Sequence, residues 1–164
     1  MRLFAVTCAF LLMSSNTWAA EVLTAQGLGP VRIGMSLKQV QKALGKTLKY
    51  NKYDEDSDCA YAERPDKKAS FMFFNYRLVR IDVEERGITS VEGAEVGMTE
   101  AALKKLHGKE AEISAHPYGG PDDHYFKILQ KAKNRLLIFE TWEGRVESFR
   151  IGTLEAAPLI EGCS

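Results

Sequence analysis

The sequence predicts an α+β protein made of two tandem repeats, each a short helix plus a three-stranded antiparallel sheet, with the helices packed on one sheet face. The main observation is a phrase that occurs twice, VRIGMSLKQVQKALGK at 31–46 and AEVGMTEAALKKLHGK at 94–109. Each copy is followed by alternating β-forming residues. Similar segments at a fixed offset indicate an internal repeat. We therefore expect a first α/β repeat over 20–87 and a second over 88–164, with the C-terminal tail in the second.

The first 19 residues have the layout of a secretory signal peptide. Arg2 precedes a mainly apolar run at 3–13, and Thr17 and Ala19 supply the small residues expected before a cut after Ala19. The run is too short to cross a bilayer, and Cys8 lies inside it rather than after it, where a lipid-bearing cysteine would stand. We expect a secreted or periplasmic protein without a membrane span; a buried N-terminal helix is the alternative.

Composition and charge exclude several broad classes. Hydrophobic residues make up 45% of the chain, which is ordinary for a globular protein with a real core. The 22 Lys and Arg balance 22 Asp and Glu, so no general attraction to nucleic acid or anionic lipid is expected. The length of 164 residues fits one domain or two small repeats that share a core.

The cysteines predict one disulfide. With Cys8 in the signal peptide, Cys59 and Cys163 remain, in a compartment where disulfides persist. A bridge that closes a loop near 100 residues stabilises the fold by up to about 4.7 kcal/mol on the chain-entropy estimate. The bridge would clasp the C-terminal tail against the first repeat. Two free thiols or a thiol active site are the alternatives, and no CxxC supports them.

Each copy of the phrase carries the signals of a capped helix. Ser36 is the expected N-cap of the first helix, and Gln39, three residues later, completes a capping box. Thr99 is the expected N-cap of the second helix, but Ala102, three residues later, cannot complete a box. Apolar residues then recur at helical spacing. Two glycines in the left-handed position after the helix are expected to end the helices, Gly45 and Gly108.

The segments after each helix alternate with period two and contain turn signals. Residues 70–85 predict a hairpin with its turn at Asn75 and Tyr76, and residues 134–152 predict another with its turn at Glu143 and Gly144. A preceding strand is expected in each half, at 59–64 and from His124 onward. This pattern gives three strands per repeat.

The repeated phrases also resemble a known group of proteins. The pattern G-M-S/T-x-x-x-[V/L]-x-x-x-[L/H]-G, found at 33–45 and 96–108, is similar to that of the β-lactamase inhibitory protein superfamily. A single copy resembles the small outer-membrane assembly lipoproteins of SmpA/BamE type. The first resemblance implies a non-enzymatic protein that docks on a partner through a concave sheet and projecting loops. The second implies a lipidated N-terminal Cys and one repeat, and this chain has neither.

Two loops carry candidate chemistry. Asp54, Asp56 and Asp58 alternate like the start of an EF-hand loop, but the sixth position would be Cys59 rather than Gly and the twelfth Pro65 rather than Glu. We interpret this segment as a solvated acidic loop, or as an acidic finger presented to a basic partner cleft. No metal site is expected there.

The second loop is HPYGGPDDHY at 116–125. Its two His and two Asp are residue types that can bind a metal or perform acid/base chemistry. Its Pro and Gly residues, however, indicate turns, and no HExxH spacing supports a zinc site. The residues that a small hydrolase would use here are His116, Asp122, Asp123 and His124.

No GxSxG, Walker loop, dinucleotide fingerprint or Cys/His nucleophile pair is present in the sequence. We therefore predict a non-enzymatic module that binds another protein, with inhibition of an extracytoplasmic enzyme as one form of that binding, and with no cofactor or nucleic-acid partner. The residues predicted to contact the partner are Asp54, Asp56, Asp58, Tyr118 and Trp142. An envelope-assembly or carbohydrate-binding factor and a small hydrolase are the alternatives.

Overall fold

The computed structural model describes residues 21–52 and 57–163, so the predicted signal peptide lies outside the described residues. The protein is mostly β, with 43% strand and 14% helix. A four-stranded sheet has the order β3-β2-β1-β8, and an eight-stranded sheet has the order β4-β5-β6-β7-β12-β11-β10-β9. The elements are β1 (Glu21–Thr24), β2 (Gly27–Leu28), β3 (Val31–Arg32), α1 (Leu37–Leu44), β4 (Tyr50–Lys52), β5 (Cys59–Glu63), β6 (Ala69–Phe74), β7 (Arg77–Val83), β8 (Ile88–Ser90), α2 (Glu100–His107), β9 (Glu112–Ala115), β10 (His124–Gln130), η1 (Lys131–Lys133), β11 (Arg135–Trp142) and β12 (Arg145–Gly152).

The predicted fold class is wrong in two respects. The strands form one shared eight-stranded sheet with four strands from each half rather than two sets of three, and the N-terminal strands build a second sheet with β8. The missed strands β4 and β9 are short and largely exposed edge strands, and β2 and β3 have two residues each. Segments of this length are too short to show a clear alternation of apolar and polar residues.

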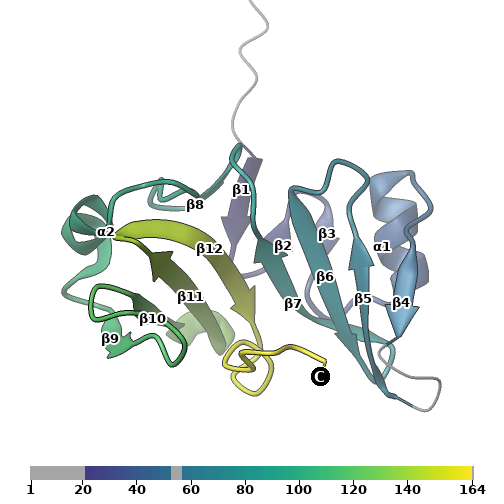
Figure 1. Cartoon of the computed structure of the whole chain (residues 1–164). Coiled ribbons are helices and arrows are strands. Elements are labelled where there is room, and N and C mark those ends of the chain that lie inside the picture. Colours follow the sequence, from purple (N-terminus) through teal and green to yellow (C-terminus); the bar gives the residue numbers. More distant parts are fainter. Residues whose placement is uncertain (1–20, 53–56, 164) are drawn as a thin grey trace, which may run out of the picture.

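The predicted hairpins are present. β6 and β7 are joined at Asn75 and Tyr76, and β11 and β12 at Glu143 and Gly144, all four with positive φ. This backbone conformation matches the right-handed twist of the flanking strands. The two halves of the large sheet join where β12 pairs antiparallel with β7, at the centre of the sheet in Figure 1.

One face of the large sheet forms the main core. Both helices and the small sheet contribute to the same apolar cluster, with Val40 of α1 and Leu103 of α2 fully buried in it. The large sheet residues at its centre are Phe71, Phe73, Ile81, Phe126, Phe139 and Phe149. α1 lies behind the sheet in the view of Figure 1. None of the helices in the described part of the chain is long and apolar enough to cross a membrane.

The repeated phrase docks each helix onto a central strand. The Gly34 N–H donates to the Leu78 carbonyl (2.8 Å), and the Leu78 N–H donates to the carbonyl of Met35 (2.8 Å). In the second half the Gly97 N–H donates to Val146 (2.7 Å), whose own N–H donates to Met98 (2.8 Å). Both glycines have positive φ, 95° and 86°, which a side chain would strain. The repetition therefore encodes a helix together with its attachment to β7 or β12.

The predicted helix caps are largely confirmed. The Ser36 side chain accepts from the Gln39 N–H and the capping box is complete, while Thr99 caps α2 without a box. Gly45 is left-handed with φ 64°, as expected. The left-handed stop expected at Gly108 is wrong, because its φ is −59°. The chain continues into a further turn there, in which the Ala111 N–H donates to the His107 carbonyl.

Candidate binding cleft

The second face of the large sheet is polar and is crossed by the C-terminal segment 153–163, which we call the strap. In Figure 1 the strap lies in front of the sheet where β7 and β12 meet. Ala157 is fully buried and packs against Tyr125 and Ile138 in a small apolar cluster. At Gly152 an added Cβ would lie 3.2 Å from the backbone nitrogen of Ala157. The absence of a side chain there lets the strap approach the sheet closely.

Two buried arginines hold the strap by its backbone. Arg80 on β7 donates to the carbonyl of Ala156 (3.0 Å) and to that of Leu159 (2.6 Å). Arg150 on β12 donates through Nε to the carbonyl of Ala157 (2.8 Å). The arginines are only 4% and 5% exposed. Because a buried cation is costly without partners, these bonds fix the course of the strap.

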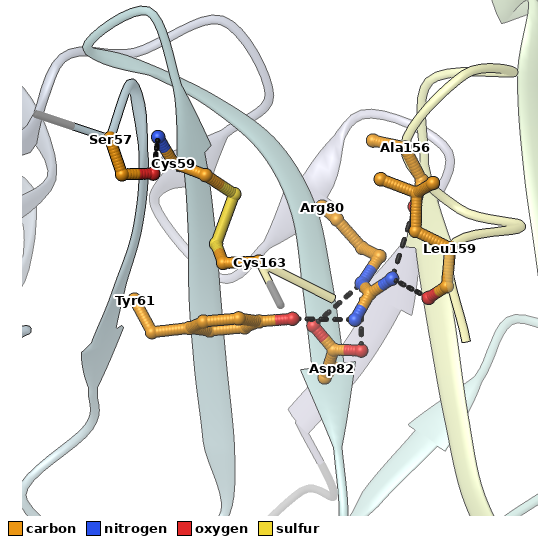
Figure 2. The surroundings of a disulfide bond; sticks show 8 residues. All are labelled: Ser57, Cys59, Tyr61, Arg80, Asp82, Ala156, Leu159 and Cys163. Carbon is orange, nitrogen blue, oxygen red and sulfur yellow. Dashed lines mark hydrogen bonds and ion pairs between the residues drawn. A yellow bond between two sulfur atoms is a disulfide. The ribbon is translucent and has the colours of Figure 1, made fainter. Parts of the chain in front are cut away.

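Each arginine is also paired with a carboxylate on the same face. Arg80 forms an ion pair with Asp82 (3.0 Å), and Arg150 forms one with Glu140 on β11 (3.0 Å). The Arg80 guanidinium donates to the Tyr61 hydroxyl as well (2.6 Å). Burial, and secondly the charge of Asp82, raises the pKa of Tyr61 to about 12. Figure 2 shows Arg80 between Tyr61 and the strap, so the face forms a continuous polar network.

The predicted disulfide closes the strap onto the first half of the chain. Cys59 at the start of β5 is bonded to Cys163, with a Cα–Cα distance of 5.4 Å. Figure 2 shows this bond beside Tyr61 and Arg80. At Gly162, which precedes Cys163, an added Cβ would lie 2.5 Å from the Tyr61 hydroxyl. The end of the strap therefore lies directly over Tyr61.

A cleft of about 750 Å³ opens between the strap and the sheet. Its acidic groups outnumber its three basic groups, and four exposed carboxylates form no ion pair or side-chain hydrogen bond with a described residue: Glu63, Glu84, Glu85 and Glu147. Burial raises the pKa of Glu84, and the neighbouring charge of Asp82 adds to the effect. The complete lining is Tyr61, Glu63, Lys67, Ala69, Ser70, Arg80, Asp82, Glu84, Glu85, Glu140, Glu147, Ser148, Arg150, Ile160, Glu161 and Gly162.

A histidine extends the polar network beyond the cleft. His116 Nδ1 accepts from the Tyr118 N–H (3.1 Å), so the ring proton is on Nε2, which lies 2.8 Å from Glu140. The Tyr125 hydroxyl lies 3.1 Å from the same Nε2. Burial, followed by the charge of Glu140, raises the pKa of Tyr125. The network therefore connects the 116–123 loop to Arg150 through Glu140.

The structure brings two of the predicted contact residues together. Tyr118 is 64% exposed and its hydroxyl donates to Glu161 of the strap (2.7 Å). Trp142 is 41% exposed and lies edge-on to His116, as Tyr118 does. Asp58 is exposed next to Cys59. The other two predicted residues, Asp54 and Asp56, lie outside the described residues.

The candidate hydrolase residues are held in separate networks. His124 Nδ1 lies 3.0 Å from Glu100 of α2, whereas His116 faces Glu140. The Asp123 carboxylate accepts backbone N–H groups from Gly120 and Glu143, and Asp122 is exposed. Over residues 21–52 and 57–163 no group of three or more His, Cys, Asp or Glu is arranged to hold a metal ion. These contacts fix the shape of the loop.

Sequence reasoning missed Arg80 and Arg150, which organise the cleft. Both stand in strands where charged and apolar residues alternate, a pattern typical of strands with one solvent-exposed face. The sequence signal for a buried polar contact was the predicted disulfide of the C-terminal tail. A tail attached to Cys59 must lie on some surface of the sheet and cover side chains there. Nothing in the local sequence indicates which arginine would donate to it.

Comparison with known proteins identifies structural neighbours only. No family model matches the chain, and no curated protein matches it. The fold is similar to that of the uncharacterized protein yfeY from Escherichia coli, with a TM-score of 0.55, 15% identity, and coverage of 79% of this chain and 98% of that chain. A DUF4309 family protein, YjgB from Bacillus subtilis, gives a TM-score of 0.45 at 13% identity, covering 78% of this chain and 84% of that chain. At such identity the likeness shows the fold alone, and neither neighbour indicates an enzymatic function.

Proposed function

We propose that the protein is a non-enzymatic binding module of the secreted or periplasmic space, which recognises another protein through the cleft beside the C-terminal strap. One observation carries the proposal: the face that forms the cleft already holds a peptide segment, the strap, through Arg80 and Arg150. Arg80, Arg150 and Asp82 are buried, Glu140 is partly buried, and each arginine is held by an ion pair. Their geometry is therefore set before any partner arrives, which lowers the entropic cost of binding.

The charge of the cleft favours a basic segment of the partner. The unpaired carboxylates at its mouth come from both halves, for example Glu84 after β7 and Glu147 on β12. The positive charges of Arg80 and Arg150 do little to offset these carboxylates. Asp82 already pairs with Arg80, and Glu140 already pairs with Arg150. A Lys- or Arg-rich loop would be attracted to this negative field, which also raises the rate of association.

The aromatic rim supports a protein partner. Tyr118 and Trp142 are exposed, both lie edge-on to His116, and Tyr118 donates to Glu161 of the strap. Tyrosine and tryptophan are enriched among the residues that dominate protein interfaces. Inhibition of an extracytoplasmic enzyme is one form that this binding can take, if the basic segment borders the enzyme's active site. Asp58 beside the disulfide remains a proposed contact.

The test is capture from an extracytoplasmic fraction with three immobilised baits. These are the oxidised protein without residues 1–19, its Glu84→Lys variant, and a matched control variant, Glu110→Lys. Glu110 is exposed, outside this cleft, and forms no ion pair with a described residue. We expect one protein to be retained by the unmodified and Glu110→Lys baits and lost from the Glu84→Lys bait. Its affinity, measured by calorimetry, should fall as salt is raised.

Equal retention by all three baits would contradict recognition through the cleft. Retention of glycan instead of protein would favour the carbohydrate-binding alternative. Loss from both variants would show that the effect is a general response to charge and not a property of this site.

A further inference from the structure

The strap consists of two parts that are attached in different ways. The inner part, 153–157, is built into the sheet: the Thr153 N–H donates to the Val79 carbonyl (2.9 Å), and the Ala157 N–H donates to the Thr153 carbonyl (3.0 Å). Ala156 and Ala157 are buried. This part has the backbone bonds and apolar burial of an ordinary structural element.

The outer part, 158–163, is mainly exposed. Leu159 and Ile160 are 45% and 44% exposed. Its attachments include the bond from Arg80 to the Leu159 carbonyl, the bond from Tyr118 to Glu161, and the disulfide at Cys163. Ordering six residues costs conformational entropy at each one, while solvent-accessible hydrogen bonds return little net free energy because water competes for them. Arg80 holds the outer part at Leu159, and the covalent bond is therefore the main attachment of the residues beyond it, 160–163.

We propose that Cys59–Cys163 acts as a redox-sensitive latch on the cleft. A protein or small-molecule dithiol reduces the S–S bond: two electrons and two protons convert the cystine to two thiols while the reductant becomes a disulfide. The outer part of the strap is then released, and the inner part stays. Cys163 is partly exposed, which gives a reductant access to the bond.

Release removes one wall of the cleft. Ile160, Glu161 and Gly162 form that wall, and Gly162 covers the Tyr61 hydroxyl. Arg80 loses its bond to Leu159 but keeps Asp82 and Ala156 as partners, so its charge is still compensated. Reduction therefore opens the cleft without breaking the ion pairs beneath it. On the proposed function, from which this consequence follows, the reduced protein binds its partner more weakly.

The latch is tested by hydrogen–deuterium exchange with mass spectrometry, which needs no partner. The oxidised protein without residues 1–19 is compared with the same protein after dithiothreitol treatment and with two variants, Cys163→Ser and Cys59→Ser. We expect the amides of 159–163, of which that of Leu159 donates to the Ala156 carbonyl (3.3 Å), to exchange at least tenfold faster in all three unlatched forms. The Ala157 amide and the amides of β7 and β12 should keep their protection.

Unchanged exchange of the 159–163 amides after reduction would overturn the proposal. So would loss of protection throughout β7 and β12, because the strap would then be inseparable from the sheet. The two serine variants remove the same bond from opposite ends, so a difference between them would identify a defect at one site and count against a latch.

The failure of this inference is distinguishable from that of the proposed function. A partner bound equally by the oxidised and reduced protein would overturn the latch and leave recognition through the cleft intact. Retention by the Glu84→Lys bait would overturn recognition through the cleft, while the exchange result would still show whether the outer strap is released.

Discussion

The two halves of the molecule attach their helices to the sheet in the same way but stabilise them differently. In both, the backbone of the Gly-Met pair exchanges hydrogen bonds with the first residues of a central strand. In the first half Leu37 begins α1 and packs against the core. The corresponding residue of α2 is Glu100, which is 7% exposed and bonds to His124 (3.0 Å) and Thr141 (2.9 Å).

This difference shows how a repeated phrase can encode attachment while its other positions diverge. The Gly-Met-Ser/Thr pattern provides the backbone contacts and the helix cap in both halves. The first helical residue differs: Leu37 packs in the apolar core, whereas Glu100 takes part in a polar network. Glu100 ties α2 to β10 and β11 through side chains, and Lys104 completes the network (2.6 Å). The second half therefore depends on ionisation at this position, and the first half does not.

The largest expected effect compares the equivalent buried residues of the helices. Leu103→Ala should lower the free energy of unfolding by about 2–5 kcal/mol, because a fully buried side chain leaves a cavity. Val40→Ala removes fewer atoms from the same cluster and should cost less. Urea denaturation measures both. A larger loss for Val40→Ala would show that α1, rather than α2, is the more tightly packed helix.

The second prediction tests the polar network of α2. Glu100→Gln should cost about 1–3 kcal/mol at neutral pH, because His124 and Thr141 would lose a charged acceptor. Burial alone would raise the pKa of Glu100, but the hydrogen bonds from Lys104, His124 and Thr141 lower it below its usual 4.5. A lowered carboxyl pKa contributes stability above 4.5 that is lost as the pH falls through the folded value.

The difference between Glu100→Gln and the unmodified protein should therefore be constant from pH 7 to about 4.5 and shrink as the pH falls below 4.5. Thermal unfolding at a series of pH values measures it. Glu110→Gln, at an exposed position, is the matched control and should differ little at any pH. A constant difference down to pH 3 would contradict a role for the charge of Glu100.

The third prediction compares the helix caps. Ser36→Ala and Thr99→Ala should each cost about 1 kcal/mol, since a backbone N–H loses its acceptor. Ser36→Ala leaves the second bond of the box in place, because its donor is the backbone N–H of residue 36 and its acceptor is Gln39 Oε1 (2.8 Å). Gln39→Ala removes the reciprocal bond alone and should cost less than Ser36→Ala. No loss of stability in Gln39→Ala would show that the reciprocal bond of the box contributes nothing.

The smallest expected effect concerns Glu84, a carboxylate of the first half. Unlike Glu100, Glu84 accepts no side-chain hydrogen bond from a described residue. Burial, and then the charges of Asp82 and Glu63, raises the pKa of Glu84. A raised carboxyl pKa favours the folded state at low pH, and that advantage is lost as the pH rises through the folded value. Glu84→Gln should therefore stabilise the protein at pH 7, by less than about 0.5 kcal/mol at this exposed site.

The gain in stability should disappear below the usual pKa of 4.5. At pH 7 the Gln substitution is therefore expected to stabilise the protein at Glu84 and to destabilise it at Glu100. Differential scanning calorimetry at pH 7 and pH 4 measures it. A destabilising effect of Glu84→Gln at pH 7 would show that the carboxylate has a stabilising partner in the folded protein.

The local features of this protein follow from short segments of its sequence. The capping box at Ser36, the left-handed end at Gly45 and the hairpin turn at Asn75 depend on residues within a few positions of one another, so each is visible in a short segment. The disulfide was predictable for another reason: with Cys8 assigned to the signal peptide, only one pairing of Cys59 and Cys163 remained. The end of α2 escaped prediction because Gly108 adopts an ordinary helical φ there.

The shared sheet and the cleft, by contrast, arise from contacts between distant parts of the chain. The edge strands β4 and β9 have too few residues to indicate a strand, and pairing with β5 and β10 defines them. Arg80 bonds to Ala156, 76 positions away in the chain, and that contact exists because the register of β7 with β12 places the strap above it. Long-range pairing of this kind depends on how the whole sheet assembles, and a short segment of sequence does not specify which distant strand or segment it will meet.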